Sequence, residues 1–272
     1  MSPFSWTSLA AAAVAVLETP EPAGKVRLTR AVAAAWAAGE IGEIGRAQPP
    51  ERPARPVLPL LRPPREMPRR RVGPGSKGRI ALYHALAHIE LNAIDLAWDL
   101  IARFTGEGLP RAFHDDWVRV AAEEAKHFTL LDARLTALGA AYGDLPAHGG
   151  LWEAAQETAR DLLARLAVVP LVLEARGLDV TPGLIAKLEA VGDTQGAAAL
   201  RVIYEEEIGH VAAGKRWFDC LCRRRGLEPD QAWPALVRRH FKGALKPPFN
   251  QAARQRAGLA PAFYQGPTGP VT

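Results

Sequence analysis

Two segments of this chain carry a glutamate followed three residues later by a histidine. The first pair is Glu124 and His127, and the second is Glu207 and His210. In a helix, residues three apart lie on one face, so each pair can direct a carboxylate and an imidazole toward a common point. Carboxylate and imidazole groups together suit iron and manganese. The sequence therefore presents two candidate halves of a metal site.

Two further glutamates lie in apolar surroundings. Glu90 follows Leu86-Ala-His-Ile, and Glu174 follows Val168-Val-Pro-Leu-Val-Leu. A carboxylate buried without a partner costs several kcal/mol, so each position needs a cation nearby. The alternative is pairing with lysine or arginine, but Arg176 lies too close in sequence to face the same way as Glu174. The interval from Glu90 to Glu124 nearly equals that from Glu174 to Glu207, which indicates two similar hairpins.

Four long segments with helical periodicity must position these residues. They cover residues 77–104, 111–138, 149–176 and 194–225, and Gly/Pro-rich breaks separate them. The break at 177–182 is expected to end the third segment, with a short helix at 183–191 after it. Segments of such similar length favour side-by-side packing as a four-helix bundle.

The remaining chain predicts additions to this bundle. Abundant Ala and Leu favour an all-α fold, with short helices at 5–17 and 25–40 before a proline-rich strap at 47–76. One more helix is expected at 231–242, ahead of a basic tail. The expected organisation is an N-terminal helical pair with the strap (1–76), the bundle (77–225) and a C-terminal helix with its tail (226–272).

Four motifs give the chain a family resemblance. They are His-Ala-Leu-Ala-His-Ile-Glu at 84–90, Glu-Glu-Ala-Lys-His-Phe at 123–128, Leu-Glu-Ala-Arg-Gly-Leu-Asp at 173–179 and Tyr-Glu-Glu-Glu-Ile-Gly-His-Val at 204–211. Residues 77–218 resemble the ferritin-like superfamily and, within it, a bacterial family of unknown function. A looser similarity extends to the di-iron tRNA 2-methylthio-isopentenyladenosine hydroxylases.

The resemblance implies two iron ions, with manganese as the alternative. Glu124 and Glu207 would bridge them, Glu90 and Glu174 would each bind one ion, and His127 and His210 would complete the ligand set. No catalytic residue beyond these ligands and no organic-cofactor motif is identified. The expected activity is O2-dependent oxidation or hydroxylation of an organic substrate, with a tRNA nucleoside as the candidate. The alternatives are a ferroxidase-like or peroxide-detoxifying protein and a bundle in which metal is purely structural.

Composition bounds the partners and the compartment. The formal charge is +5 and the pI about 9.5, with basic runs at 69–71, 223–225 and 238–246 that suit an anionic partner or simply solvate helix ends. Without a flavin fingerprint or a cysteine cluster, electrons must come from a separate donor. No signal pattern or membrane-spanning run is seen, so a cytoplasmic protein, with a homodimer as one expected assembly, is predicted.

Several residues near the motifs are expected to lie outside the ligand set. His84 and His88 should point away from Glu90, either behind the ligands or at the surface, and Tyr204 should be a core residue. Pro170 should disrupt its helix and open room beside the metals. Solvent exposure or salt bridging is expected for Glu123, Glu205 and Glu206, and a helical core-and-edge placement for Cys220 and Cys222.

Overall fold

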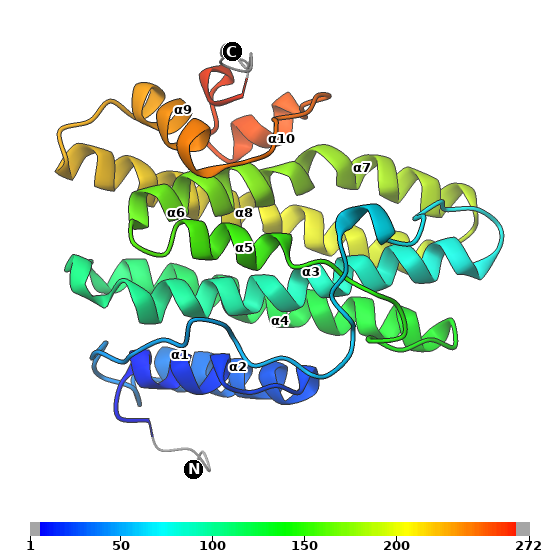
Figure 1. The fold of residues 1–272 in the computed structure, drawn as a ribbon, viewed down its shortest axis with the longest axis horizontal. Coiled ribbons are helices and arrows are strands. Elements are labelled where there is room, and N and C mark those ends of the chain that lie inside the picture. Colours follow the sequence, from blue (N-terminus) through cyan, green and yellow to red (C-terminus); the bar gives the residue numbers. More distant parts are fainter. Residues whose placement is uncertain (1–5, 265–272) are drawn as a thin grey trace. The chain divides into compact units, whose positions relative to one another are not determined.

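The computed structural model describes residues 6–264, and within them the chain is all-helical (Figure 1). No strand occurs in this range, and extended pairing is limited to one isolated bridge between Leu61 and Ala147. The predicted all-α class is confirmed, and the structure is compatible with a helical bundle. The α-helices are α1 (Leu9–Leu17), α2 (Pro22–Ala37), α3 (Ser76–Arg103), α4 (Arg111–Ala137), α5 (Gly150–Glu157), α6 (Leu162–Val168), α7 (Ala175–Ala190), α8 (Thr194–Arg224), α9 (Pro229–His240) and α10 (Gln251–Arg256).

Two compact units make up the described chain. Unit 1 contains the chain up to Trp152 together with Val191–Ala199, and unit 2 contains Glu153–Ala190 and the chain from Leu200 onward. Helix α8 begins in unit 1 and continues into unit 2. Each unit therefore holds one of the two Glu-x-x-His pairs, and each is described below by itself.

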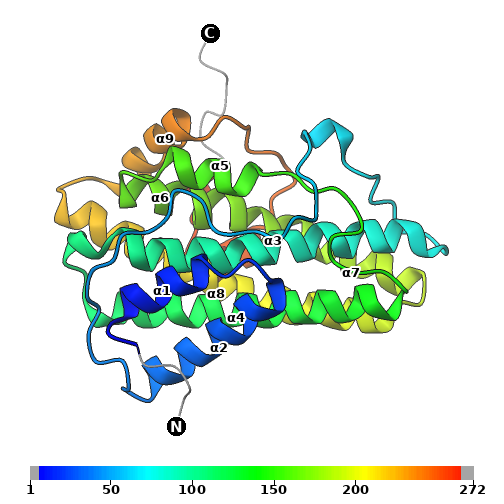
Figure 2. The same cartoon turned by 60° about the horizontal axis from the view of Figure 1, so that its bottom comes forward.

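Unit 1 is built on the hairpin of α3 and α4. Helix α1 packs against α3 and helix α2 against α4, as Figure 2 shows. A buried ion pair between Lys25 of α2 and Asp95 of α3 joins these layers, and the Trp98 indole N–H donates to the Thr29 hydroxyl at 3.0 Å. The predicted N-terminal helical pair is confirmed. Its first helix was expected from residue 5, which lies outside the described residues; α1 begins at Leu9 because the Ser8 side chain caps it.

The proline-rich strap runs back along α3 in an extended conformation. Its residues between α2 and α3 contain one short 3-10 turn, Pro64–Glu66. The Arg103 guanidinium donates to the Pro50 carbonyl at 3.0 Å, and Arg55 donates to the Asn92 side chain at 2.7 Å. Prolines remove backbone donors and fix φ, which explains why this stretch forms neither helix nor sheet.

Unit 2 corrects the prediction for the third segment. One helix was expected over 149–176, but α5 ends at Glu157 and α6 starts anew because the Asp161 side chain accepts from the Leu163 N–H at 3.0 Å. A π-helical segment, Val169–Glu174, then leads into α7. The predicted break at 177–182 and the separate helix at 183–191 are wrong, since α7 runs through both ranges. Buried Leu178, Thr181 and Leu188 on α7 offset the local cost of Gly177 and Pro182.

The end of the chain covers unit 2 with helices α9 and α10. Helix α9 packs on α6, where the Trp233 indole donates to the Ala167 carbonyl at 3.1 Å, and α10 packs on α7. Helix α9 begins two residues before the predicted start because Pro229 occupies its first turn. Across residues 6–264, no helix has the length and the apolar content needed to cross a membrane.

Candidate metal centre

Helix α3 carries Glu90 on its buried face. Ala87, Leu91 and Ile94 on the same helix are fully buried, and Glu90 itself is only 4% exposed. The hydrophobic pattern that buries this face also carries the carboxylate into the interior, where water cannot solvate its charge.

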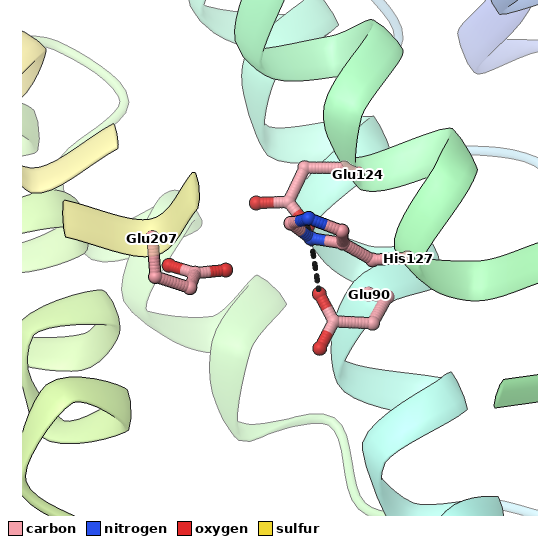
Figure 3. Close-up of side chains that lie close together, drawn as sticks. All are labelled: Glu90, Glu124, His127 and Glu207. Atoms are coloured by element: carbon pink, nitrogen blue, oxygen red, sulfur yellow. Dashed lines mark hydrogen bonds and ion pairs between the residues drawn. The ribbon is translucent and has the colours of Figure 1, made fainter. Parts of the chain in front are cut away.

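Helix α4 brings Glu124 and His127 to the same place. Both side chains are 0% exposed and lie among the buried residues Trp117 and Leu131. The His127 Nδ1 atom lies 3.3 Å from Glu124 Oε2 and 3.7 Å from Glu90 Oε2. Figure 3 shows these three side chains, together with Glu207 of unit 2, which is described below with its own helix. The three unit 1 groups each offer a ligand atom, and these atoms lie within 4.8 Å of one another.

Burial strongly perturbs this cluster when no cation is present. Burial, and then the negative charge of Glu124, raises the pKa of Glu90 well above its usual value. For His127, burial alone would lower the pKa, but the contacts with Glu124 and Glu90 outweigh it and raise the pKa to about 11. Two carboxylates and one imidazole are thus buried together, and the carboxylates favour a positive charge between them.

A metal ion fits this donor set better than a basic side chain does. The alternative of pairing with lysine or arginine fails for Glu90, whose ion-pair partner among residues 6–264 is His127. Carboxylate oxygens and an imidazole nitrogen on adjacent helices are ligands suited to iron or manganese.

Unit 2 carries a second half-site on helix α8. His210 is 0% exposed and Glu207 is 9% exposed, and His210 Nδ1 lies 3.7 Å from Glu207 Oε1. The pair therefore repeats the α4 arrangement of a carboxylate and an imidazole on one helical face.

Close packing between Gly214 and Pro170 joins α8 to the π-helical segment within unit 2. A Cβ atom at Gly214 would lie 2.4 Å from the Pro170 Cβ atom, so the glycine lets the α8 backbone approach the Pro170 ring. Glu174 closes the π-helical segment and is half-buried. The disruption expected at Pro170 thus takes the form of π-helical turns, which are frequent at functional sites.

Asp193 fixes the start of α8 inside unit 1. Its carboxylate accepts from the Gly196 N–H at 2.9 Å, which is an N-cap, and from the Tyr83 hydroxyl at 2.8 Å. Arg79 at 3.0 Å and Arg134 at 2.9 Å complete its partners. The helix that carries Glu207 and His210 therefore starts from a position held by both α3 and α4.

An aromatic cluster lies beside Glu90 on α3. His84 and His88 are both buried rather than at the surface, because Tyr142 covers them. The Tyr142 ring stacks on both imidazoles, and its hydroxyl lies 2.8 Å from His88 Nδ1. Burial, with a smaller effect from the Arg55 charge, lowers the pKa of His88 to about 3. Next to this cluster, Met67, Leu145 and Leu151 help to line a cavity of about 30 Å³, room for about one water molecule.

Sequence reasoning missed Tyr142 and Asp193. For Tyr142 no local signal exists, since it follows α4 in a turn and meets α3 only through the fold. For Asp193 a signal was available, because aspartate directly before a periodic segment is typical of an N-cap.

The glutamates and cysteines described here follow the predictions, and Tyr204 does not. Glu123 pairs with Arg119 at 2.9 Å and Glu205 pairs with Arg256 at 2.6 Å, so both carboxylates are used in salt bridges. Tyr204 was expected in the core but is only half-buried, because its hydroxyl accepts from the partly exposed Asn250 side chain at 3.0 Å. Both cysteines have free thiols, with Cys222 buried and Cys220 partly exposed on α8.

The sequence of this chain is similar to that of a bacterial protein and matches a protein family. It is 44% identical over 207 residues to a protein of Haemophilus influenzae described as "Uncharacterized protein", and the match covers 74% of this chain and 71% of the relative. No solved structure matches the chain. The family described as "Protein of unknown function (DUF455)" matches residues 18–265, most of the chain, and the protein therefore belongs to this family.

Proposed function

We propose that this protein is a di-metal carboxylate protein of the ferritin-like kind that holds two iron ions, with manganese as the alternative metal. The observation that carries the proposal is the buried cluster of Glu90, Glu124 and His127, whose ligand atoms lie within 4.8 Å of one another. The same Glu-x-x-His pattern on α8 supports a second pair of ligands, and the resemblance adds Glu174 to it. In this proposal the two half-sites act together.

The ligand roles follow the ferritin-like resemblance. Glu124 and Glu207 would bridge the ions, Glu90 and Glu174 would each bind one ion, and His127 and His210 would complete the set. Bound iron(II) would supply a binding position for O2 and electrons for the reduction of O2. The chain itself contributes burial, which keeps bulk water from the ligands, and the α3–α4 packing, which holds three donors in place before metal arrives.

The reaction class we propose is O2-dependent oxidation or hydroxylation of an organic substrate. A bundle that only stores metal needs little beyond its helices, whereas here α1, α2 and the strap cover α3 and α4, and α9 and α10 cover α6 and α7. Such covering supports a shaped substrate site or partner surface. The resemblance to the tRNA 2-methylthio-isopentenyladenosine hydroxylases makes a tRNA nucleoside the first substrate to test, with a separate protein as electron donor.

Metal analysis of purified protein tests the site. About two irons per chain are expected after purification with iron supplied. Glu124→Ala and Glu207→Ala should each lose this metal, while Glu123→Ala and Glu205→Ala, which change adjacent carboxylates held in salt bridges, should retain it. A folded wild-type protein that binds no metal, or equal loss in all four variants, would contradict the proposal.

Oxygen consumption tests the reaction class. Iron-loaded protein supplied with a reductant and tRNA that carries 2-methylthio-isopentenyladenosine should consume O2 in proportion to product formed, and unmodified tRNA is the control. Repeated iron(II) oxidation without any organic substrate would instead favour a ferroxidase-like protein, and an iron-loaded protein that takes up no O2 would indicate a structural metal.

A further inference from the structure

The exposed apolar side chains of the described residues concentrate on one short stretch of the strap. Val57 is 90% exposed, Leu58 52%, Leu60 51% and Leu61 56%, and these four account for most of the large exposed hydrophobic side chains in residues 6–264. We call these four residues the strap patch. Single exposed aliphatic residues are ordinary on a protein surface, but a contiguous group of this kind marks an interaction site.

Arginines surround the strap patch. Residues 51–71 contain seven arginines and two glutamates, a formal charge of +5, which equals the charge of the whole chain. The remaining sequence is therefore neutral in sum. Among residues 6–264, Arg62, Arg69, Arg70 and Arg71 are exposed and take part in no ion pair, whereas Arg65 lies 3.8 Å from Glu66. The positive field of the protein originates mainly from this segment.

The backbone that carries the strap patch is held in place on both sides. Before it, Arg55 lies 2.8 Å from Asp95, and the Ala54 N–H donates to the Leu17 carbonyl at 2.8 Å. After it, the Arg62 N–H donates to the Ala147 carbonyl at 2.8 Å, and the Ala147 N–H donates to the Leu60 carbonyl at 3.0 Å. The patch is thus an anchored extended segment whose side chains face outward, which lowers the entropy lost when a partner binds.

The chemistry of the segment distinguishes between classes of anionic partner. Residues 51–71 contain no aromatic side chain, so they offer no platform on which nucleic-acid bases could stack. Apart from one short 3-10 turn the segment is extended, and backbone that is not helical leaves polar groups without partners in hydrocarbon. Protein interfaces, by contrast, combine an apolar centre with a charged rim and are enriched in arginine.

We propose that the strap patch with its arginines is a docking surface for an acidic protein that has an apolar recess ringed by carboxylates. Its four aliphatic side chains would enter the recess, and the arginines would pair with the rim and accelerate association. The small apolar area fits a transient complex better than a permanent one.

Site-specific crosslinking in living cells tests this proposal. A photoreactive benzoyl-phenylalanine at position 57 should crosslink one acidic protein in the native cells, and the same group at position 202 should not. Val202 is also an exposed valine, at 40%, but lies on α8 outside the strap. Absence of any protein crosslink at position 57 would overturn the proposal.

Binding of that purified protein to the full chain provides the second measurement. The dissociation constant should rise about tenfold in Arg62→Glu/Arg65→Glu and in Leu58→Ser/Leu61→Ser, and should rise with salt in the wild type. Arg238→Glu/Arg239→Glu makes the same change in net charge on α9 and should leave binding unchanged. Equal weakening in both charge variants would mean general attraction and overturn the proposal. So would strap-dependent binding of bulk tRNA or phosphatidylglycerol vesicles in place of the protein.

Discussion

The two half-sites use the same residue types on differently built helices. In unit 1, Glu90, Glu124 and His127 project from two uninterrupted α-helices and are at most 4% exposed. In unit 2, Glu207 and His210 lie on α8, but Glu174 is the last residue of a π-helical segment and is half-buried. If the proposed metal site forms, unit 1 would supply its ligands from regular helices, while the backbone that carries Glu174 could be reshaped without breaking a regular helix.

Loosening the packing around the unit 1 half-site, Glu90 with Glu124 and His127, should have the largest effect on stability and on metal content. Leu131, one turn after His127, is 0% exposed, so Leu131→Ala should cost about 2–5 kcal/mol of unfolding free energy because it leaves a cavity. Metal content should fall as well. Urea unfolding and iron analysis measure both, with Val180→Ala as an exposed control in unit 2. A Leu131→Ala protein with unchanged stability and unchanged iron content would show that the unit 1 half-site tolerates loose packing.

Separating the segments of unit 2 should have the next largest effect. Gly214→Ala places a methyl group 2.4 Å from the Pro170 Cβ atom, which should cost about 1–3 kcal/mol and push the π-helical segment that ends at Glu174 away from α8. Gly177→Ala is the matched control, since nothing lies within 4 Å of its added Cβ atom. That variant should gain about 0.5–1 kcal/mol through helix propensity. Stabilisation by both variants would refute the close contact at Pro170.

The third prediction concerns the start of α8, the helix that belongs to both units. Asp193→Asn keeps the side-chain shape but removes the charge that Arg79 and Arg134 contact, at a cost of about 1–3 kcal/mol near neutral pH. The side chains of the two candidate metal half-sites should be displaced less than the side chains that contact residue 193. Thermal or urea unfolding of wild type and variant measures the difference.

The pH dependence of this difference has a defined sign. Burial would raise the pKa of Asp193, but hydrogen bonds from Tyr83, the Gly196 N–H and Arg79, together with the Arg134 charge, lower it below its usual 3.8. A carboxyl with a lowered folded-state pKa stabilises the protein above its unfolded pKa and loses this effect as pH falls through the folded value. The advantage of wild type over Asp193→Asn should therefore shrink below about pH 4. An advantage that grows with acidity would contradict this assignment.

Removal of a tyrosine hydroxyl near each half-site should have the smallest effect on the free energy of unfolding. Tyr142→Phe removes the contact with His88 and should cost about 0.5–1.5 kcal/mol, with the ring stacking retained. Tyr204→Phe removes the contact with Asn250 in unit 2 and should cost less, because Asn250 is partly exposed to water whereas His88 is buried. Unfolding midpoints of the two variants, measured side by side, sharpen the comparison between the units. A larger loss for Tyr204→Phe would reverse the expected order.

Periodicity predicted the long helices well and the irregular one badly. The bounds of α3, α4 and α8 lie within one residue of the predicted segments, because a strong apolar face and Gly/Pro breaks both mark them. The break expected at Gly177–Pro182 fails, since buried contacts on α7 override the local preferences of two residues. The π-helical segment could be anticipated only as a disturbance at Pro170.

Local spacing could predict paired ligands but not their distant neighbours. Glu124 with His127, and Glu207 with His210, are visible because three residues separate each pair on one helix. The Lys25–Asp95 pair and the Tyr142 cover of His88 join residues far apart in the chain. Which partners such residues meet depends on the packing of whole helices, which spacing does not encode.

The anchored strap gives the protein a particular pattern of protease sensitivity. Arg52, Arg55 and Arg62 each precede a proline, and trypsin cleaves such bonds poorly, whereas the exposed arginines at 65 and 69–71 do not. Within the strap, brief digestion should therefore nick the chain between residues 65 and 72. The N-terminal fragment would stay attached after the cut, because Lys25 and Arg55 both bind Asp95 of α3. The nicked protein should therefore migrate as a single species under native conditions and separate into two fragments only when it is denatured.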